Sequence, residues 1–211
     1  MGLLGQMLRR LHNQNIMTFS PEVSRFRMSG NHLKRLTKEL DQLGQTAPDC
    51  FRLLEPYRDI LSELMTETRS LLKTYRQPPD PLVLCHTDLH AGNLLLEPNG
   101  RIRIVDWDGA RIGRAEADLM MFGAGIGGKL SDPFSLAAFR KGYGPLQVNE
   151  ELIRLLRYLR IIEDLSLFLA RIADPITTES RRNRDIGYVL ENFANGNTID
   201  CAKRGLGPWN N

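Results

Sequence analysis

The chain has 211 residues, of which 42% are hydrophobic and 25% charged, a composition typical of one ordinary globular domain. Its 28 lysines and arginines stand against 25 acidic residues, and a net charge of only +3 does not favour nucleic acid as a partner. No apolar run approaches the roughly 20 residues needed to cross a bilayer, so the sequence predicts no membrane-spanning segment and no membrane partner.

The cysteines and the first residues indicate the cellular compartment. Cys50, Cys85 and Cys201 are odd in number and widely spaced, so they predict neither a disulfide framework nor a zinc site. Gln6 and Arg9 interrupt the apolar stretch at the start of the chain, which disfavours a secretory signal. Both observations predict a reducing, cytoplasmic location.

The first 80 residues have the hydrophobic spacing of helices. Leucine recurs at intervals of three to four residues in three segments, at residues 3–11, 33–43 and 61–72. Asn31 is placed to cap the second of these helices. Three prolines between residues 76 and 81 then end the helical region.

Short apolar runs of strand length follow. They comprise residues 81–85, 94–96 and 102–105. The pair Asn99-Gly100 lies between the last two runs, and this pair favours a tight hairpin turn. The sequence therefore predicts a small β-hairpin within helical surroundings.

Helical spacing returns after this hairpin. Ser131–Pro133 has the pattern of an N-cap followed by proline in the first turn. Asn149 is placed to cap a long helix that extends through Ile172, and a last helix is predicted from residue 180 to 195.

Together these elements predict one domain of the α+β class, mostly α. Its expected parts are a helical region at residues 1–80, the strand and hairpin region at 81–118, and a second helical region at 119–211.

Polar residues are dense at 86–93, between two predicted strands. Such groups cost desolvation free energy in a connection between buried strands unless they bind a ligand. Asp106 follows the third strand, and folding of the hairpin should bring it beside Asn93. With Asp88, these side chains offer the oxygen ligands of Mg²⁺, which proteins hold with one or two carboxylates and substrate phosphates.

The order of these residues resembles that of a kinase. The segment His86-Thr-Asp-Leu-His-Ala-Gly-Asn93 resembles the H-R-D-L-x-x-x-N catalytic loop, with Thr87 at the place of arginine. Ile104-Val-Asp-Trp-Asp108 resembles the D-F-G metal-binding motif, with tryptophan and aspartate replacing phenylalanine and glycine. The loop and both departures resemble the aminoglycoside phosphotransferase family of small-molecule kinases.

Two further segments resemble one branch of this family. Arg157-Tyr-Leu-Arg-Ile-Ile-Glu-Asp164 and the pair Asp118-Leu119 are similar to the spectinomycin-phosphotransferase-like members. The resemblance extends from the first helix to about residue 200 and is most specific from residue 86 to 118. It implies the fold of a protein-kinase-like C-terminal lobe whose hairpin carries the catalytic and metal-binding loops.

The resemblance also implies the reaction and its cofactors, ATP and Mg²⁺. Asp88 would accept the proton of a substrate hydroxyl that attacks the γ-phosphorus, and His90 would donate a hydrogen bond to the transferred group. Asn93 and Asp106 would hold Mg²⁺ against the nucleotide phosphates. The implied acceptor is a hydroxyl of a small, amine-bearing molecule, an aminoglycoside or an aminocyclitol such as spectinomycin. Choline, homoserine and sugar kinases share the architecture, so the choice of acceptor stays open.

Other residues have supporting or alternative roles in this interpretation. His86 and Asp118 are expected to hold the catalytic loop by hydrogen bonds rather than to react. Asp108, Glu163 and Asp164 are candidate substrate contacts.

Each candidate substrate contact has a simpler explanation. A carboxylate such as Asp108 is also common in an exposed loop without any ligand. Glu163 or Asp164 would be explained equally well by a salt bridge with Arg157 or Arg160 on the same helix. The arginines of this region are interpreted as solvated helix faces, and His12 and His32 are assigned no special role.

A complete kinase also needs a glycine-rich loop, a strand lysine and a helix glutamate, which precede the catalytic loop. Only 85 residues precede His86, and the first 80 have helical spacing, so an N-terminal β-rich lobe is expected to be absent. The glycine-rich residues 123–128 follow the catalytic loop and are interpreted as a turn on the substrate side. The chain is therefore expected to form half of an ATP site, with a separate N-terminal lobe as a possible partner.

Two other functions stay open. A non-catalytic remnant or ligand-binding scaffold would explain an incomplete site, although retention of Asp88, Asn93 and Asp106 argues against long decay. A metal hydrolase with His86 and His90 as ligands would need more histidine or acidic ligands. The sequence has only two other histidines, both in the early helices.

Overall fold

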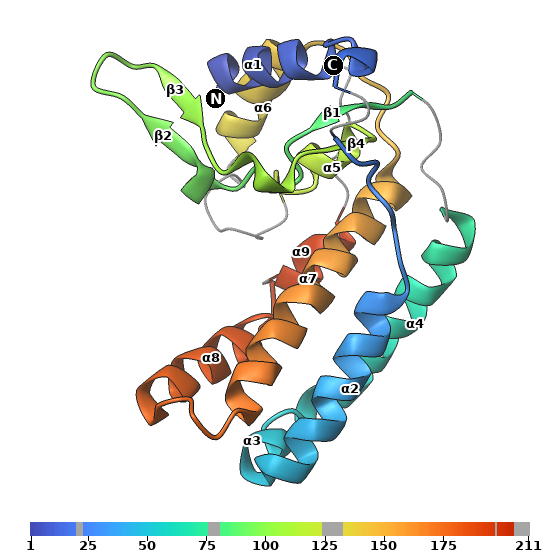
Figure 1. Ribbon diagram of the computed structural model, residues 1–211, viewed down its shortest axis with the longest axis vertical. Coiled ribbons are helices and arrows are strands. Elements are labelled where there is room, and N and C mark those ends of the chain that lie inside the picture. Colours follow the sequence, from blue (N-terminus) through green and yellow to red (C-terminus); the bar gives the residue numbers. More distant parts are fainter. Residues whose placement is uncertain (20–22, 76–80, 124–132, 197, 205–211) are drawn as a thin grey trace. The chain divides into compact units, whose positions relative to one another are not determined.

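The computed structural model describes residues 1–19, 23–75, 81–123, 133–196 and 198–204. The chain divides into two compact units (Figure 1). The first unit comprises Met1–Met28, Tyr75–Arg157 and Arg204–Asn211, and the second unit comprises Ser29–Thr74 and Tyr158–Lys203. Among the described helices, none combines the length and apolar character required to cross a membrane.

The described residues of the first unit form short strands and several helices. Its strands are β1 (Val83–Cys85), β2 (Leu94–Leu96), β3 (Ile102–Ile104) and β4 (Arg111–Gly113). Its helices are α1 (Gly2–His12), α5 (Glu116–Leu119) and α6 (Pro133–Tyr143), together with the beginning of α7 (Glu150–Ala173) and single 3₁₀ turns at Ile16–Thr18, Ala91–Asn93 and Trp107–Gly109. The strands form two antiparallel pairs, β1 with β4 and β2 with β3 (Figure 1).

The predicted hairpin is present. Leu95 is paired with Arg103, and Gly100 has the positive φ of +79° that tight turns require and glycine adopts most easily. The Asn99 side chain accepts a hydrogen bond from the Arg101 N–H at 2.9 Å, which fixes the turn. Strand β4 was not predicted, because three residues show no periodicity and the strand is defined by its pairing with β1 and by a bridge between Ile112 and Arg25.

Helices α1 and α6 pack closely in the first unit (Figure 1). A Cβ atom at Gly5 would lie 2.7 Å from the Tyr143 nitrogen, and one at Gly142 would overlap the Gly2 carbonyl, so only glycine permits this approach. The buried core around the contact consists of Leu4, Leu8, Leu89, Ala115, Leu119, Phe122, Phe139, Tyr143 and Ile153. This core lies directly beneath the residues that follow β1, because Leu89 belongs to both.

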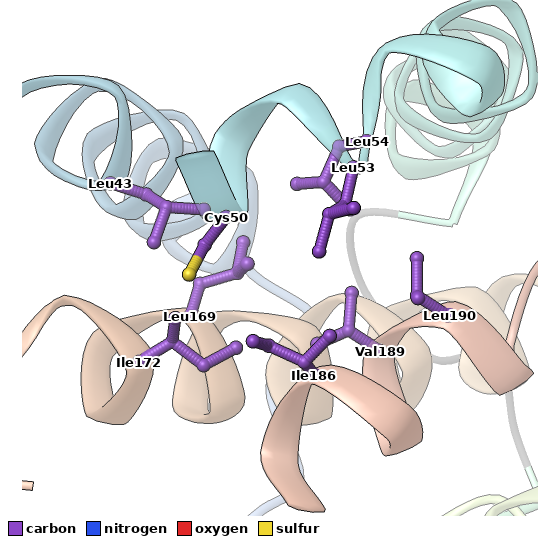
Figure 2. A pocket seen from close by; sticks show the side chains of 9 residues that line it. All are labelled: Leu43, Cys50, Leu53, Leu54, Leu169, Ile172, Ile186, Val189 and Leu190. Atoms are coloured by element: carbon purple, nitrogen blue, oxygen red, sulfur yellow. The ribbon is translucent and has the colours of Figure 1, made fainter. Parts of the chain in front are cut away.

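The second unit is helical. It contains α2 (Asn31–Thr46), α3 (Pro48–Arg52), α4 (Arg58–Thr74), the remainder of α7, α8 (Glu179–Glu191), α9 (Thr198–Lys203) and a 3₁₀ turn at Glu55–Tyr57. Figure 2 shows a small pocket of this unit, into which Leu43 and Cys50 point from one side and Leu169 and Ile172 from the other. Its lining is apolar, so the pocket belongs to the core of the second unit.

The helix ends agree in part with the predictions. Asn149 caps α7, because its side chain accepts a hydrogen bond from the Leu152 N–H at 3.0 Å. Asn31 does not cap α2, since it is the first helical residue and the cap position is Gly30. Pro133 begins α6 as predicted, whereas Ser131, Asp132, the prolines before residue 81 and most of the glycine-rich segment lie outside the described residues. The last predicted helix is shorter than expected, and α9 was missed.

A buried ion pair stabilises the second unit and predicts how its stability depends on pH. Arg171 donates two hydrogen bonds to the buried Asp185 carboxylate, at 2.8 and 2.7 Å. These bonds lower the pKa of Asp185, although burial acts in the opposite direction. Because the folded-state pKa is the lower one, this stabilisation is complete above the unfolded pKa of about 4 and is lost as pH falls through the folded value.

Asp185→Asn is therefore expected to lower the free energy of unfolding by about 2 kcal/mol at pH 7. The difference from the parent chain should shrink toward pH 2, which urea denaturation across this pH range would measure. Asp49→Asn is the matched control, since Asp49 pairs with Arg52 on an exposed surface. An equal loss at pH 7 and pH 2 would contradict the assigned role of the Asp185 charge.

Candidate active site

The loop that follows β1 places Asp88 beside Asn93. The Asn93 side-chain amide donates a hydrogen bond to the Asp88 carbonyl oxygen at 2.9 Å, and it lies 3.5 Å from the Asp88 carboxylate. Asn93 is buried, whereas the Asp88 side chain is 30% exposed and can meet a ligand. The amide nitrogen of Asn93 is thus used within the loop, and its Oδ1 is the atom suited to a cation.

Asp106 lies at the same end of the hairpin. The Val105 N–H donates to the Asn93 carbonyl oxygen at 3.0 Å, and Leu94 pairs with Ile104. Asp106 is exposed and has a φ of +64°, a left-handed conformation that turns the chain sharply after β3. The hairpin therefore brings the Asn93 backbone beside Val105, the residue before Asp106, and the approach of the Asn93 and Asp106 side chains stays a prediction.

His90 adds a hydrogen-bond donor beside Asp88. Its Nδ1 accepts a hydrogen bond from the Gly92 N–H at 3.0 Å, so the proton of the neutral ring lies on Nε2. This Nε2 is 3.7 Å from the Asp88 carboxylate, and the His90 side chain is 32% exposed. Asp88 and His90 thus present an acceptor and a donor close together at the surface.

Asp118, a residue of α5, anchors the loop that follows β1. It is completely buried, and its carboxylate accepts hydrogen bonds from the backbone N–H groups of His86 at 3.0 Å and Thr87 at 2.6 Å. His12 Nε2 lies 3.0 Å from the same carboxylate. Two consecutive loop amides are therefore held by one buried acid.

His86 is also enclosed by hydrogen bonds. Its Nε2 lies 2.9 Å from the Val105 carbonyl oxygen, and its Nδ1 accepts from the Asp88 N–H at 3.3 Å. The ring packs edge-on against Trp107, with 4.7 Å between ring centroids. Because both ring nitrogens are occupied and the residue is fully buried, His86 is not placed to bind a metal ion.

Thr87 joins the two loops of the candidate site. Its φ of +69° is unusual for a β-branched residue, and the hydrogen bond to Asp118 holds it there. Its hydroxyl donates to the Gly109 carbonyl oxygen at 2.7 Å, and a Cβ at Gly109 would approach this hydroxyl to 3.1 Å. Thr87 thus links the Asp88 loop to the turn that carries Asp106.

The three candidate substrate contacts belong to different units. Asp108 is exposed on the 3₁₀ turn after Asp106. Glu163 and Asp164 belong to the second unit, where Glu163 is exposed and Asp164 pairs with Arg160 at 3.2 Å. One of the alternative salt bridges is therefore present.

Two predictions about basic residues are wrong. Arg157 is not on a solvated face but is completely buried, and it donates to the carbonyl oxygens of Met120 at 2.9 Å and Phe122 at 2.6 Å. His12 is not an ordinary polar helix residue, since it is buried against Asp118. The signal for His12 is its place four residues after Leu8, on the buried face of α1.

A groove of about 700 Å³ adjoins the candidate site in the first unit. It is lined by Met7, Arg10, Leu11, Gln14, Ile102, Arg103, Ile104, Val105 and Trp107. The lining combines apolar side chains with two arginines. Because Val105 and Trp107 flank Asp106, the groove reaches the end of the hairpin where the candidate metal ligands lie.

The donor set at the hairpin end fits a magnesium ion. Asp106 supplies a carboxylate and Asn93 an amide oxygen, which are hard ligands that leave positions for phosphate oxygens. Among the described residues, the group of His, Cys and acidic ligand atoms that lie within 4.8 Å of one another is that of His12, Cys85 and Asp118. Asp118 and His12 are hydrogen-bonded to each other and to other groups, so this second cluster is a hydrogen-bond network.

Comparison with known proteins agrees with this geometry. Residues 1–159 match the model of the phosphotransferase enzyme family, APH. A crystal structure of spectinomycin phosphotransferase APH(9)-Ia in complex with ADP and spectinomycin is similar, with a TM-score of 0.83, 25% identity, and coverage of 95% of this chain and 63% of that chain. The AMP-bound complex of the same enzyme gives a TM-score of 0.81, with 25% identity and coverage of 95% and 64%.

More distant structures share the fold alone. A choline/ethanolamine kinase family protein from Mesorhizobium loti has a TM-score of 0.50 and 20% identity, with 95% of this chain and 63% of that chain covered. No match was found among curated proteins. The chain spans less than two thirds of the length of the spectinomycin phosphotransferase structures.

The prediction of a mostly helical, kinase-like lobe with a small hairpin is confirmed by these similarities. The family match covers the catalytic loop, the hairpin and the Asp118 anchor, and it ends within α7. The chain therefore belongs to the phosphotransferase enzyme family, as the resemblance of its catalytic loop predicted.

Proposed function

We propose that this chain carries the catalytic and metal-binding side of an ATP-dependent phosphotransferase that acts on a hydroxyl of a small, amine-bearing molecule. The observation that carries the proposal is the placement of Asp88, Asn93 and Asp106 at one end of the hairpin. The similar spectinomycin phosphotransferase was crystallised with ADP and spectinomycin, which supports an aminocyclitol or aminoglycoside as acceptor.

Each residue has a defined task in the proposed reaction. Asp88 accepts the proton of the acceptor hydroxyl as its oxygen attacks the γ-phosphorus. Asn93 Oδ1 and the Asp106 carboxylate hold Mg²⁺, which neutralises phosphate charge when it is bound. His90 Nε2 donates a hydrogen bond to the transferred group, and Asp108 lies on the turn where it would attract a cationic acceptor.

The groove beside α1 is the proposed position of the nucleoside. Ile102 and Ile104 offer an apolar surface to a base, and the groove leads to Asp106, where the phosphates would meet the metal. Arg10 adds positive charge to this path, whereas the charge of Arg103 is paired with Glu97. We also propose Glu163 and Asp164 as residues that contact the amino groups of the acceptor.

The geometry disfavours a metal hydrolase that uses His86 and His90. Both nitrogens of His86 are hydrogen-bonded within the protein, and His90 Nδ1 accepts from the Gly92 N–H. Of the four ring nitrogens, His90 Nε2 would then be the one left to bind the metal. A catalytic zinc ion usually has three protein ligands. Stoichiometric zinc in the purified protein would argue for this alternative.

Nucleotide binding tests the proposed metal site. ADP and ATP are expected to bind the purified chain more weakly by at least tenfold when Mg²⁺ is removed with EDTA, because the ion links Asp106 and Asn93 to the phosphates. Asp106→Asn should abolish this dependence on Mg²⁺, whereas Asp41→Asn on the exposed surface of α2 should retain it. Isothermal titration calorimetry measures both effects.

Transfer to an acceptor decides between an enzyme and a binding scaffold. Phosphorylated spectinomycin or another aminocyclitol, formed from ATP and detected by mass spectrometry, supports the proposal. Mg²⁺-dependent nucleotide affinity without transfer to any amine-bearing alcohol would instead favour a non-catalytic scaffold.

A further inference from the structure

A chain of buried hydrogen bonds connects α6 and α1 to the catalytic loop. The Tyr143 hydroxyl lies 2.6 Å from His12 Nδ1, and His12 Nε2 lies 3.0 Å from Asp118 Oδ2. Asp118 in turn accepts from the N–H groups of His86 and Thr87. The side chains that form this network, Tyr143, His12 and Asp118, are all buried.

The direction of the protons follows from the acceptors. Ionised Asp118 can only accept, so His12 Nε2 carries the proton that points at it. In the neutral ring, His12 Nδ1 then accepts from the Tyr143 hydroxyl. Burial raises the pKa of Tyr143, which keeps this hydroxyl protonated, although the nearby Arg9 acts in the opposite direction. In this hydrogen-bond network, Tyr143 therefore donates to His12, and His12 donates to Asp118.

The close approach of α1 and α6 aligns the hydrogen bonds between Tyr143, His12 and Asp118. His12 is the last residue of α1 and Tyr143 the last residue of α6, and these helices meet where Gly5 and Gly142 leave room for backbone contact. The Tyr143 ring also lies beside Phe139, with 6.0 Å between centroids. Tyr143 and His12 are therefore held by helix packing rather than by the catalytic loop itself.

The loop needs such support because part of it is strained. Thr87 adopts a φ of +69°, which costs free energy in a β-branched residue, and its N–H bond to Asp118 opposes relaxation. If Asp118 turned, the N–H groups of both His86 and Thr87 would lose their acceptor. Asp88 follows directly, so a change at Thr87 would move the proposed catalytic carboxylate.

We propose that His12 is a positioning residue for phosphoryl transfer, which Tyr143 holds in place and which fixes Asp118 and thereby the Asp88 loop. This role rests on the proposed function of Asp88. Misplacement of a reacting group by about 1 Å can lower a rate about a hundredfold without weakening substrate binding.

Three substitutions test the proposal in the full chain. His12→Leu removes the donor to Asp118, and His12→Gln can restore it through the side-chain amide. Tyr143→Phe removes only the terminal hydroxyl and keeps the packed ring. His32→Leu in α2 is the matched control, since this histidine is half-buried in the second unit.

Hydrogen exchange of the His86 and Thr87 amides, followed by NMR, is the readout that needs no activity. His12→Leu is expected to accelerate their exchange at least tenfold, Tyr143→Phe less, and His12→Gln least, with exchange in α8 unchanged. In the transfer assay, His12→Leu should lower kcat by ten- to a hundredfold while the KM for ATP stays within twofold. His12→Gln should recover most of this loss.

The possible outcomes separate the two proposals. Unchanged amide exchange and unchanged kcat in folded His12→Leu would overturn the positioning role, as would a His12→Gln variant as impaired as His12→Leu. If His12→Leu does not fold, Tyr143→Phe decides by the same readouts, and parental exchange at Thr87 would overturn the proposal. If the parent chain transfers no phosphate but His12→Leu still releases the two amides, the proposed function fails and the support of the loop by His12 stands.

Discussion

Asp88→Asn is expected to lower phosphoryl transfer by about 10²–10⁴-fold, because asparagine cannot accept the proton of the acceptor hydroxyl. The fold should remain, since the Asp88 contacts reported above mainly involve its backbone: its carbonyl oxygen accepts from Asn93 and its N–H donates to His86. Steady-state rates with a saturating aminocyclitol would measure the change in kcat.

The effect on binding distinguishes a catalytic role from a structural one. Mg²⁺-dependent affinity for ATP should change by less than about tenfold in Asp88→Asn, because Asn93 and Asp106 remain. Asp59→Asn at the start of α4 is a suitable control for the change of charge. Turnover close to that of the parent chain would show that Asp88 is not the base.

Arg157→Met is expected to cause the largest loss of stability, about 3 kcal/mol. Arg157 is completely buried and donates to the carbonyl oxygens of Met120, Phe122 and Arg204, at 2.9, 2.6 and 2.5 Å. Methionine fills much of the volume but satisfies none of these acceptors, and an unpaired buried carbonyl is costly. Thermal or urea denaturation of the purified variant measures the change.

A matched substitution lies one turn earlier on α7. Arg154 is partly exposed and lies 3.9 Å from the exposed Glu151, so Arg154→Met should lower stability by less than about 1 kcal/mol. Equal losses in the two variants would mean that the removal of a positive charge from α7, and not the three carbonyl contacts, determines the effect. Such a result would contradict the role assigned to Arg157.

Some features of the fold and of the candidate site follow from local sequence patterns, and others depend on tertiary contacts. The hairpin and the Asn149 cap were predicted, because each depends on residues adjacent in sequence. The approach of Asn93 and Asp106 is predicted from the same hairpin, since a two-stranded turn brings its two ends together. Residues 86–108 also predict the family, because phosphoryl transfer requires particular side chains at fixed spacing.

The helical class, the hairpin and the groups proposed to meet a nucleotide can be predicted from local sequence patterns. The burial of Arg157 and His12, the pairing of β4 with β1 and the left-handed conformation of Thr87 depend on tertiary contacts. Local patterns cannot predict them, because a polar side chain is buried only where distant segments contribute its hydrogen-bond partners. His12 meets Asp118 across 106 positions of sequence, and no local periodicity encodes that encounter.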